Sequence, residues 1–284
     1  MTDVSLIGLG PMGIALAHAL QPKYTLTLWN RTAGRAHPLL NQGTLLATDA
    51  RSAAEASPIV LMCVADYAAA RSILAQPGAM QALRGKVLVQ LSTGTPQDAR
   101  DAWAAADGVA YLDGALLATP GQIDRPDTPL FISGEERALA ICRPVLETIA
   151  GRLMYMGEPV GNAAAWDLAT LSCMFGAMSG FFHGARICEA EGLGVGEFGR
   201  MIGAISPVLG EMIRAEGDAI EAGSYGEPQS SMATCAGSGR LFVKQAREAG
   251  LDGSFPAFLA GMFDRALAAG FAHERLAAMI KVLR

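Results

Sequence analysis

A short apolar run that leads into the spacing Gly-x-Gly-x-x-Gly opens the chain and constrains its fold more than any other feature. The run begins at Val4, and a helical pattern follows the three glycines Gly8, Gly10 and Gly13. A dinucleotide-binding site requires this order of strand, glycine turn and helix. The first glycine permits the tight turn, the second lets the backbone approach a pyrophosphate, and the third lets the helix pack against the strand. Because the helix N-terminus offers free N–H groups to phosphates, the stretch predicts a bound dinucleotide. The alternative is a glycine-rich loop without a ligand.

The end of the second predicted strand indicates which dinucleotide is bound. Residues 24–29 are followed by Asn30, Arg31 and Thr32, and Arg35 comes soon after. An NAD site usually has Asp or Glu near this point to hold the ribose 2′-OH, and this stretch has neither. Two arginines and a hydroxyl suit the 2′-phosphate of NADP(H) instead. We therefore predict NADP(H), against the alternative of a solvated basic turn.

Composition narrows the class of protein. The chain has 284 residues, of which 51% are hydrophobic, and a formal net charge of −5; this length allows two domains with separate cores. No basic stripe indicates a nucleic-acid partner, and no apolar stretch reaches the ~20 residues of a membrane span. The first residues do not resemble a signal peptide. Five cysteines without a C-x-x-C motif favour a cytoplasmic protein with reduced thiols. The four scattered histidines predict no metal site.

Strand and helix patterns alternate in the first half of the chain and give way to helices in the second. The alternation predicts a doubly wound, mainly parallel sheet, with ligands bound beyond the C-terminal strand ends. The predicted strands are 4–8, 24–29, 58–64, 87–92, 109–113, 129–133 and 153–156, and the helices between them are 12–21, 32–42, 51–56, 67–75, 79–84, 97–106 and 135–149. A long helix over 161–191 then precedes helices at 195–205, 207–221, 229–249, 255–269 and 272–283. We predict two domains, 1–158 and 159–284.

Polar side chains at one strand end have two interpretations. Ser92 and Thr93 lie at the end of a predicted strand, where they could orient a nicotinamide or a substrate. They could equally cap the helix that begins near Gln97, which is the commoner use of Ser and Thr. Both alternatives are open at this point.

Asp167 is the one acidic residue near the start of the long helix. Helical spacing puts an apolar set on its face, namely Leu171, Met174, Phe175 and Met178. A carboxylate on such a surface is costly unless it is exposed, paired or functional. The alternative is an Asp that is favoured only by the helix dipole.

A row of small residues marks another face of the same helix. Ser172, Gly176, Gly180 and Gly184 recur at every fourth position. Small side chains at this spacing let a second helix approach closely. The row predicts a tight helix–helix contact between subunits, with a contact inside one subunit as the alternative.

Taken together, these residues resemble the imine reductases, including the reductive aminases, within the β-hydroxyacid dehydrogenase superfamily. The glycine fingerprint is common to the superfamily, whereas the Gly-Thr-Pro turn, the Ala-Thr-Pro segment and the helix Asp are more specific to imine reductases. The resemblance spans both domains and rests on residues 8–13, 29–32, 63–67, 91–96, 113–115 and 118–120, and on Gly161 with Asp167 six residues later.

This resemblance implies a Rossmann domain over 1–158 and an all-α domain like that of 6-phosphogluconate dehydrogenase over 159–284. Hydroxyacid dehydrogenases carry a catalytic Lys on the interdomain helix, whereas this chain has Asp167 there and no lysine near the helix start. A Lys ammonium stabilises an alkoxide, but a carboxylate attracts a cationic iminium, by on the order of several kcal/mol in a poorly solvated pocket. The sign of the charge therefore predicts a cationic substrate.

The implied activity is NADPH-dependent reduction of a cyclic imine or iminium to an amine, an oxidoreductase reaction on a C=N bond. Asp167 would be catalytic, stabilising the iminium and supplying or relaying the proton. The alternatives are a 3-hydroxyacid dehydrogenase-like oxidoreductase that has lost its Lys, and an NADPH-binding protein without turnover. Phe175 stands where some reductive aminases have a Tyr, which weakens an expectation of efficient coupling of amine and ketone, and Trp166 also replaces a Tyr that is common in relatives.

The site residues follow from the motifs and the resemblance. We also expect a homodimer with intertwined helical domains, in which the partner subunit contributes Met212, Met232 and Cys235. For the apolar residues of the pocket, the competing interpretation is ordinary core. The expected cofactor-binding residues are Gly8, Leu9, Gly10, Pro11, Met12, Gly13, Asn30, Arg31, Thr32, Arg35, Cys63, Val64, Ala65 and Thr93, and the expected substrate pocket is Ser92, Trp166, Leu171, Met174, Phe175, Met178, Met212 and Met232.

Overall fold

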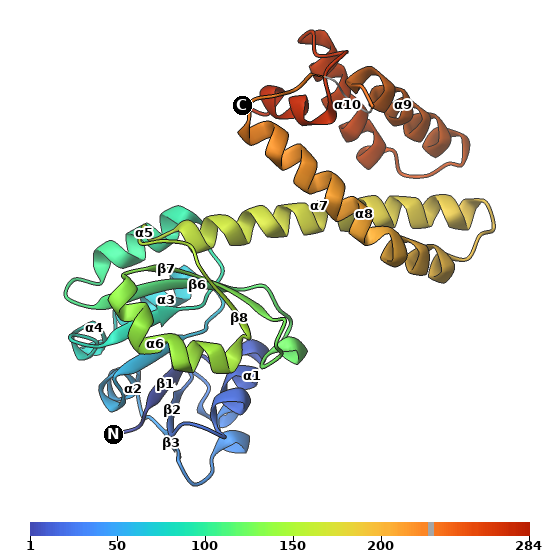
Figure 1. Cartoon of the computed structure of the whole chain (residues 1–284). Coiled ribbons are helices and arrows are strands. Elements are labelled where there is room, and N and C mark those ends of the chain that lie inside the picture. Colours follow the sequence, from blue (N-terminus) through green and yellow to red (C-terminus); the bar gives the residue numbers. More distant parts are fainter. Residues whose placement is uncertain (227–229) are drawn as a thin grey trace. The chain divides into compact units, whose positions relative to one another are not determined.

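The computed structural model describes residues 1–226 and 230–284, which form two compact units, Met1–Ser172 and Cys173–Arg284 (Figure 1). The units divide within the long helix, whereas the predicted domains divide before it, so the division into 1–158 and 159–284 stays a prediction. No helix in the described ranges is long and apolar enough to cross a membrane.

An eight-stranded sheet forms the centre of the first unit, in the order β3-β2-β1-β4-β5-β6-β7-β8 (Figure 1). Neighbouring strands are parallel except for β6 and β7, which are antiparallel. The mainly parallel sheet confirms the prediction. The strands are β1 (Val4–Ile7), β2 (Leu26–Trp29), β3 (Thr44–Leu46), β4 (Ile59–Met62), β5 (Val87–Gln90), β6 (Ala110–Leu116), β7 (Pro129–Gly134) and β8 (Arg152–Tyr155).

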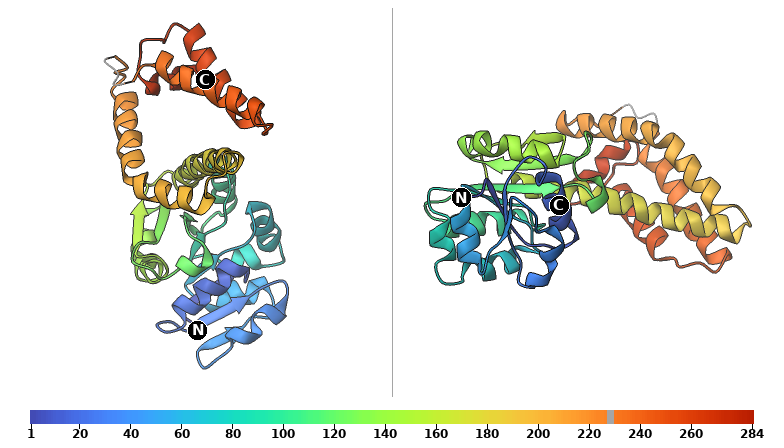
Figure 2. Two further views of the ribbon diagram at one scale, coloured as in Figure 1. Left: turned by 90° about the vertical axis from the view of Figure 1, so that its right-hand side faces the viewer. Right: turned by 90° about the horizontal axis from the view of Figure 1, so that it is seen from below.

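Helices cover both faces of this sheet, as the three views together show (Figures 1 and 2). One core contains Leu16 of α1 and Leu146 of α6, and the other contains Ala53 of α2, Ala70 of α3 and Leu83. Burial on both faces explains why the strands are nearly continuous apolar runs. The helices are α1 (Pro11–Leu20), α2 (Ala50–Ala56), α3 (Tyr67–Leu74), α4 (Ala79–Ala82), α5 (Pro96–Ala105) and α6 (Glu136–Ile149).

The predicted helix over 32–42 is wrong. Two short 3-10 turns, η1 (Ala33–Arg35) and η2 (His37–Leu39), occupy this stretch, and the unpredicted strand β3 follows. Pro38 accounts for the difference, because its ring and its missing N–H disfavour a helix that continues past it. The strand was missed because it has three residues, too few to show an alternating pattern.

The second unit is built from helices, as predicted. The predicted helices at 195–205 and 207–221 are one helix, α8, with Pro207 inside it. Proline cannot donate to the carbonyl of Gly203, and the Ser206 hydroxyl donates to that carbonyl instead, at 2.9 Å. The elements are α7 (Asn162–Ala190), whose first residues belong to the first unit, α8 (Val195–Glu221), α9 (Met232–Glu248), α10 (Ser254–Ala268) and the 3-10 helix η4 (Leu276–Val282).

Two predictions at the ends of this unit need correction. Gln229, the first residue of the predicted helix 229–249, lies outside the described residues, and α9 begins after Ser231, whose hydroxyl accepts the Thr234 N–H at 3.3 Å. The predicted α-helix over 272–283 is the shorter 3-10 helix η4.

One predicted pocket residue, Met232, lies in the core of the second unit. Met232 is fully buried beside Ala266 and Ala278. Its side chain is enclosed by residues of its own unit, and its place in a substrate pocket stays a prediction. Methionine fills such irregular spaces well.

The row of small residues on α7 makes contacts within the second unit. A Cβ at Gly184 would lie 2.7 Å from the ring of Phe198 on α8, and one at Gly180 would lie 3.6 Å from the ring of Phe255 on α10. Gly176 has no such neighbour within 4 Å. For Gly180 and Gly184, the contact inside one subunit is thus the interpretation that holds.

Candidate active site

The glycine turn after β1 has the geometry that a dinucleotide requires. Gly8 has a φ of +103°, and a Cβ there would lie 2.1 Å from the carbonyl oxygen of Cys63. A Cβ at Gly13 would lie 2.0 Å from the carbonyl oxygen of Gly8, whereas one at Gly10 would meet nothing within 4 Å. The first and third glycines are therefore fixed by the fold of the loop itself. The second leaves open space where a phosphate can approach the backbone.

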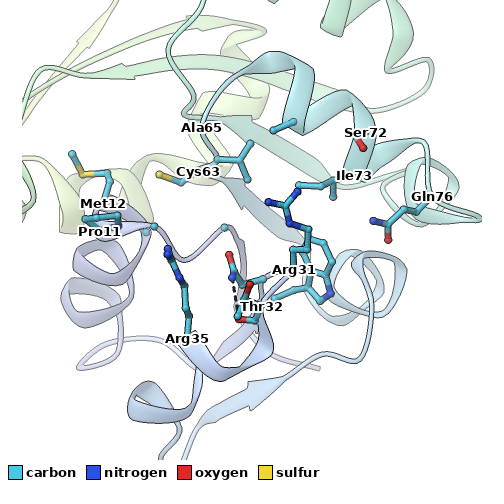
Figure 3. A pocket seen from close by; sticks show the side chains of 17 residues that line it. Pro11, Met12, Arg31, Thr32, Arg35, Cys63, Ala65, Ser72, Ile73 and Gln76 are labelled. Carbon is cyan, nitrogen blue, oxygen red and sulfur yellow. Dashed lines mark hydrogen bonds between the residues drawn. The ribbon is translucent and has the colours of Figure 1, made fainter.

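A cavity of about 540 Å³ lies beside this loop (Figure 3). It lies where β1 and β4 meet, the point at which the strand order reverses, and ligands of doubly wound sheets bind at such a point. None of the described residues that line it is acidic. The lining residues are Gly8, Gly10, Pro11, Met12, Gly13, Trp29, Asn30, Arg31, Thr32, Arg35, Cys63, Val64, Ala65, Ala69, Ser72, Ile73 and Gln76.

The residues after β2 build one edge of this cavity. The Asn30 side chain accepts the Leu9 N–H at 2.9 Å and donates to the Thr32 carbonyl at 3.0 Å. Arg35 donates to the Leu9 carbonyl at 3.2 Å. Asn30 and Arg35 thus tie the glycine turn to the loop after β2, and Arg31 and Thr32 are exposed at the same edge. Two guanidinium groups and a hydroxyl fit a phosphate group.

The structure brings together most of the predicted cofactor-binding residues. Leu9 is fully buried and takes part through its backbone, and Thr93 is exposed outside the lining of this cavity. The prediction omitted Trp29 and four residues on α3 or just after it. The positions Ala69, Ser72, Ile73 and Gln76 recur at helical spacing after a strand end, which is the pattern that could have identified them. The binding roles stay predictions.

The turn before α5 separates the two interpretations of Ser92 and Thr93. Thr95 caps α5, because its hydroxyl accepts the Asp98 N–H at 3.1 Å and Asp98 accepts the Thr95 N–H at 3.0 Å. The interpretation of Ser92 and Thr93 as the helix cap is therefore wrong. Ser92 is buried, and its hydroxyl accepts the Val64 N–H at 3.2 Å, so it holds the backbone after β4.

Asp167 is buried in the first turns of α7, with 3% of its surface exposed. Burial raises the pKa of its carboxyl, and the nearby negative charge of Asp113 raises it further. A carboxyl of this kind holds a proton to higher pH than an exposed one. That direction suits a group that donates a proton.

The sequence reasoning assigned no role to Asp113, which lies on β6 and is 1% exposed. The Tyr67 hydroxyl and the Ala164 N–H both donate to its carboxylate, the latter at 3.2 Å. Burial raises the pKa of Asp113, and these two donors oppose the shift. Because these three residues are distant in sequence, no local motif indicates that they meet.

The predicted substrate-pocket residues on α7 differ in exposure. Trp166 packs against Phe131, with ring centroids 6.0 Å apart, yet remains 56% exposed. Leu171 is partly buried, and Met174, Phe175 and Met178 are exposed. In the second unit, Met212 is exposed and Cys235 is partly buried; both lie along an apolar cavity of about 770 Å³. The lining of a substrate pocket by these residues stays a prediction.

Two family models match the chain. Residues 160–284 match the C-terminal domain of NADPH-dependent reductive aminase-like proteins. Residues 3–157 match the NAD binding domain of 6-phosphogluconate dehydrogenase. The two matches meet close to the start of α7.

Individual relatives point the same way. The chain is 33% identical to an NADPH-dependent reductive aminase from Aspergillus oryzae over 190 residues, which are 66% of this chain and 64% of that protein, just under two thirds of its length. Among solved structures, an imine reductase from Streptomyces aurantiacus has a TM-score of 0.94 at 32% identity, with 99% of both chains covered. An imine reductase from Myxococcus stipitatus in complex with NADP+ has a TM-score of 0.92 at 30% identity, covering 99% of this chain and 100% of that one.

Proposed function

Because the chain belongs to the imine reductase and reductive aminase family, we propose that it is an NADPH-dependent oxidoreductase that reduces the C=N bond of an imine to give an amine. When bound, NADPH supplies the hydride that reduces the imine carbon. The observation that carries the proposal is the buried acid Asp167 at the start of α7, where related hydroxyacid dehydrogenases have a Lys. Residues 1–158 are proposed as the cofactor domain, and residues 159–284 as the domain for substrate and dimerisation.

The residues of the cavity beside β1 would hold the cofactor. The glycine turn offers backbone N–H groups to the pyrophosphate at the N-terminus of α1. Arg31, Thr32 and Arg35 would hold the 2′-phosphate, and no acidic residue lines the described cavity to repel it. Cys63, Val64 and Ala65, at the end of β4, would form the opposite wall.

Asp167 is proposed as the group that handles the proton. Its raised pKa lets it hold a proton that the imine nitrogen can accept, which leaves a carboxylate beside the new iminium. Reduction of the iminium carbon gives a neutral amine and leaves the Asp167 carboxylate negative, and a proton from solvent then restores the acid. A positive side chain at this position would instead oppose formation of the iminium.

The proposed substrate class rests on the apolar side chains that flank Asp167 in the sequence of α7 or follow it along that helix. Trp166 and Leu171, together with the exposed Met174, Phe175 and Met178, suit a compact hydrocarbon framework such as a cyclic imine. Phe175 has no hydroxyl, so we propose reduction of preformed imines in preference to the coupling of a ketone and an amine.

The activity is tested by mixing the purified protein with NADPH and 2-methyl-1-pyrroline and following the cofactor absorbance. Rapid oxidation of NADPH with formation of 2-methylpyrrolidine is the expected result. Turnover restricted to 3-hydroxy acids with NADP would contradict the proposal, and so would NADPH binding without turnover on a broad panel of imines.

We also propose a cytoplasmic homodimer with intertwined C-terminal domains. The proposal of a dimer is supported by the many large apolar side chains that α7 and α8 expose, because a partner subunit would remove them from water. The cytoplasmic location is supported by the five cysteines, all of which are free thiols. The exposed apolar residues include Met174, Phe175, Met178, Phe182, Met201, Ile205, Val208, Leu209, Met212 and Ile213.

Light scattering after size exclusion is expected to give the mass of two chains for the wild type. Val208→Asp places a charge among the exposed apolar residues of α8 and should shift the mass toward one chain. Arg214→Asp, at an exposed charged position of the same helix, is the matched control and should remain dimeric. A monomeric wild type would refute the dimer.

A further inference from the structure

The N-terminus of α7 is held by side chains from the sheet. An α-helix leaves its first four N–H groups without partners inside the helix. Here the Ser133 hydroxyl on β7 accepts the Ala163 N–H at 3.1 Å, and the Asp113 carboxylate on β6 accepts the Ala164 N–H at 3.2 Å. Residues 30 and 51 positions earlier in the chain therefore fix the first turn of this helix.

Asp113 is the stronger of the two anchors. It is 1% exposed, so its carboxylate depends on the hydrogen bonds that it accepts. The Tyr67 hydroxyl donates to one of its oxygens and the Ala164 N–H to the other. Charge-assisted hydrogen bonds are about twice as strong as neutral ones, and the N-terminal end of the helix dipole favours a negative charge. Asp113 thus links α3, β6 and α7.

Asp167 lies three residues after Ala164, on the turn that follows the anchored one. We infer that Asp113 is a positioning residue for the reaction: by holding the Ala164 N–H and the Tyr67 hydroxyl, it fixes the first turn of α7 and hence the setting of the Asp167 carboxyl. The inference rests on the proposed function, in which Asp167 handles the proton. Nothing in that mechanism requires Asp113 itself to touch the substrate.

The charge of Asp113 adds a second effect on the same acid. In the described part of the chain, the titratable side chains that act on Asp113 or Asp167 are these two carboxyls, Tyr67 and Tyr111. The negative charge of Asp113 raises the pKa of Asp167. Removing that charge lowers the pKa of Asp167, so a reaction that needs protonated Asp167 should lose rate at a lower pH.

Two substitutions separate position from charge. Asp113→Asn keeps an oxygen that can accept the Ala164 N–H but removes the charge, and Asp113→Ala removes both. For Asp113→Asn we expect kcat at low pH to stay within about threefold of the wild-type value. The alkaline limb of its kcat–pH profile should shift toward lower pH by about half a pH unit or more. For Asp113→Ala we expect kcat to fall about tenfold or more at every pH. The dissociation constant for NADPH should stay within about threefold in both.

Hydrogen exchange supplies a readout that does not depend on turnover. Amides of the segment 160–172 should exchange faster in Asp113→Ala than in wild type, because the first turn of α7 loses an anchor. Asp49→Asn is the matched control, since Asp49 caps α2 in the same unit with an exposed carboxyl. It should leave kcat, the pH profile and the exchange of 160–172 unchanged.

The outcomes are distinct for the inference and for the function on which it rests. If Asp113→Ala has the same kcat, the same pH profile and the same hydrogen exchange over 160–172 as the wild type, the proposed role of Asp113 is refuted. Absence of imine turnover in the wild type would overturn the proposed function, and the exchange of 160–172 would still decide whether Asp113 anchors α7. If Asp113→Ala does not fold, the pH profiles of Asp113→Asn and Tyr67→Phe test the inference instead. Loss of the Tyr67 donor destabilises the Asp113 anion, so Tyr67→Phe should also shift the alkaline limb of kcat toward lower pH. An unmoved limb in both would refute the inference.

Discussion

Asp167→Asn is expected to reduce kcat for imine reduction by a factor of about 100 or more, while the dissociation constant for NADPH changes by less than about threefold. The amide has nearly the same shape as the carboxyl, but it cannot give up a proton or carry the negative charge that pairs with an iminium. Asp167→Lys should be at least as damaging, because it replaces the attraction of an iminium by repulsion. Steady-state rates with 2-methyl-1-pyrroline and a binding titration with NADPH check both variants.

The stability of Asp167→Asn distinguishes a lost catalytic group from a damaged fold. Burial raises the pKa of Asp167 above its unfolded value. The stability that this acid contributes is therefore present below its unfolded pKa and is lost as pH rises through its folded pKa. At neutral pH, which is above the unfolded pKa, keeping this carboxyl buried therefore lowers the free energy of unfolding. Asparagine does not titrate, so Tm of Asp167→Asn should be no lower than Tm of the wild type.

A matched control addresses the loss of a carboxyl as such. Asp101 is an exposed acid on α5 of the same unit, and its side chain accepts a hydrogen bond from Gln97. Asp101→Asn should keep wild-type kcat and NADPH binding. Near-normal turnover in Asp167→Asn would remove this residue from the mechanism, whatever the control shows.

The fold was predictable where one local pattern decides the structure. The glycine spacing after β1 specified strand, turn and helix, and the apolar runs specified the other long strands because both faces of the sheet are covered. The stretch 32–42 was not predictable from periodicity, since Pro38 interrupts a pattern that otherwise appears helical. At Pro207 the reverse holds, because the Ser206 hydroxyl replaces a lost donor and the helix continues.

The candidate site was predictable only in part. Asp167 was found because an acid in an apolar helix start is unusual, and the resemblance gave it a role. The network around Asp113 was not found, because its partners Tyr67 and Ala164 are 46 and 51 residues away and meet only once the sheet and α7 are in place. Met232 was expected in the pocket from the resemblance, as a residue of the partner subunit, and its burial beside Ala266 and Ala278 could not be foreseen because these residues meet only in the folded unit.

The preference for NADPH over NADH is expected to depend on Arg31. Arg31→Ala should raise KM for NADPH about 10- to 100-fold, which corresponds to the loss of one charge-assisted hydrogen bond of about 1.5–3 kcal/mol. KM for NADH should change less than about threefold, because NADH lacks the 2′-phosphate that the guanidinium would hold. Raised ionic strength should reduce the ratio of KM for NADH to KM for NADPH in the wild type, and should reduce it less in Arg31→Ala.

Arg35 offers a contrast, since it also donates to the Leu9 carbonyl and so supports the glycine turn. Arg35→Ala should therefore raise KM for both cofactors, and more for NADPH than for NADH. Arg31→Ala should raise KM mainly for NADPH. Arg84→Ala, at an exposed position of the same unit outside the lining of the cavity, is the control and should leave both KM values unchanged. Equal losses for NADPH and NADH in Arg31→Ala would mean that this side chain does not recognise the 2′-phosphate, and the assignment of the edge after β2 to that group would have to be abandoned.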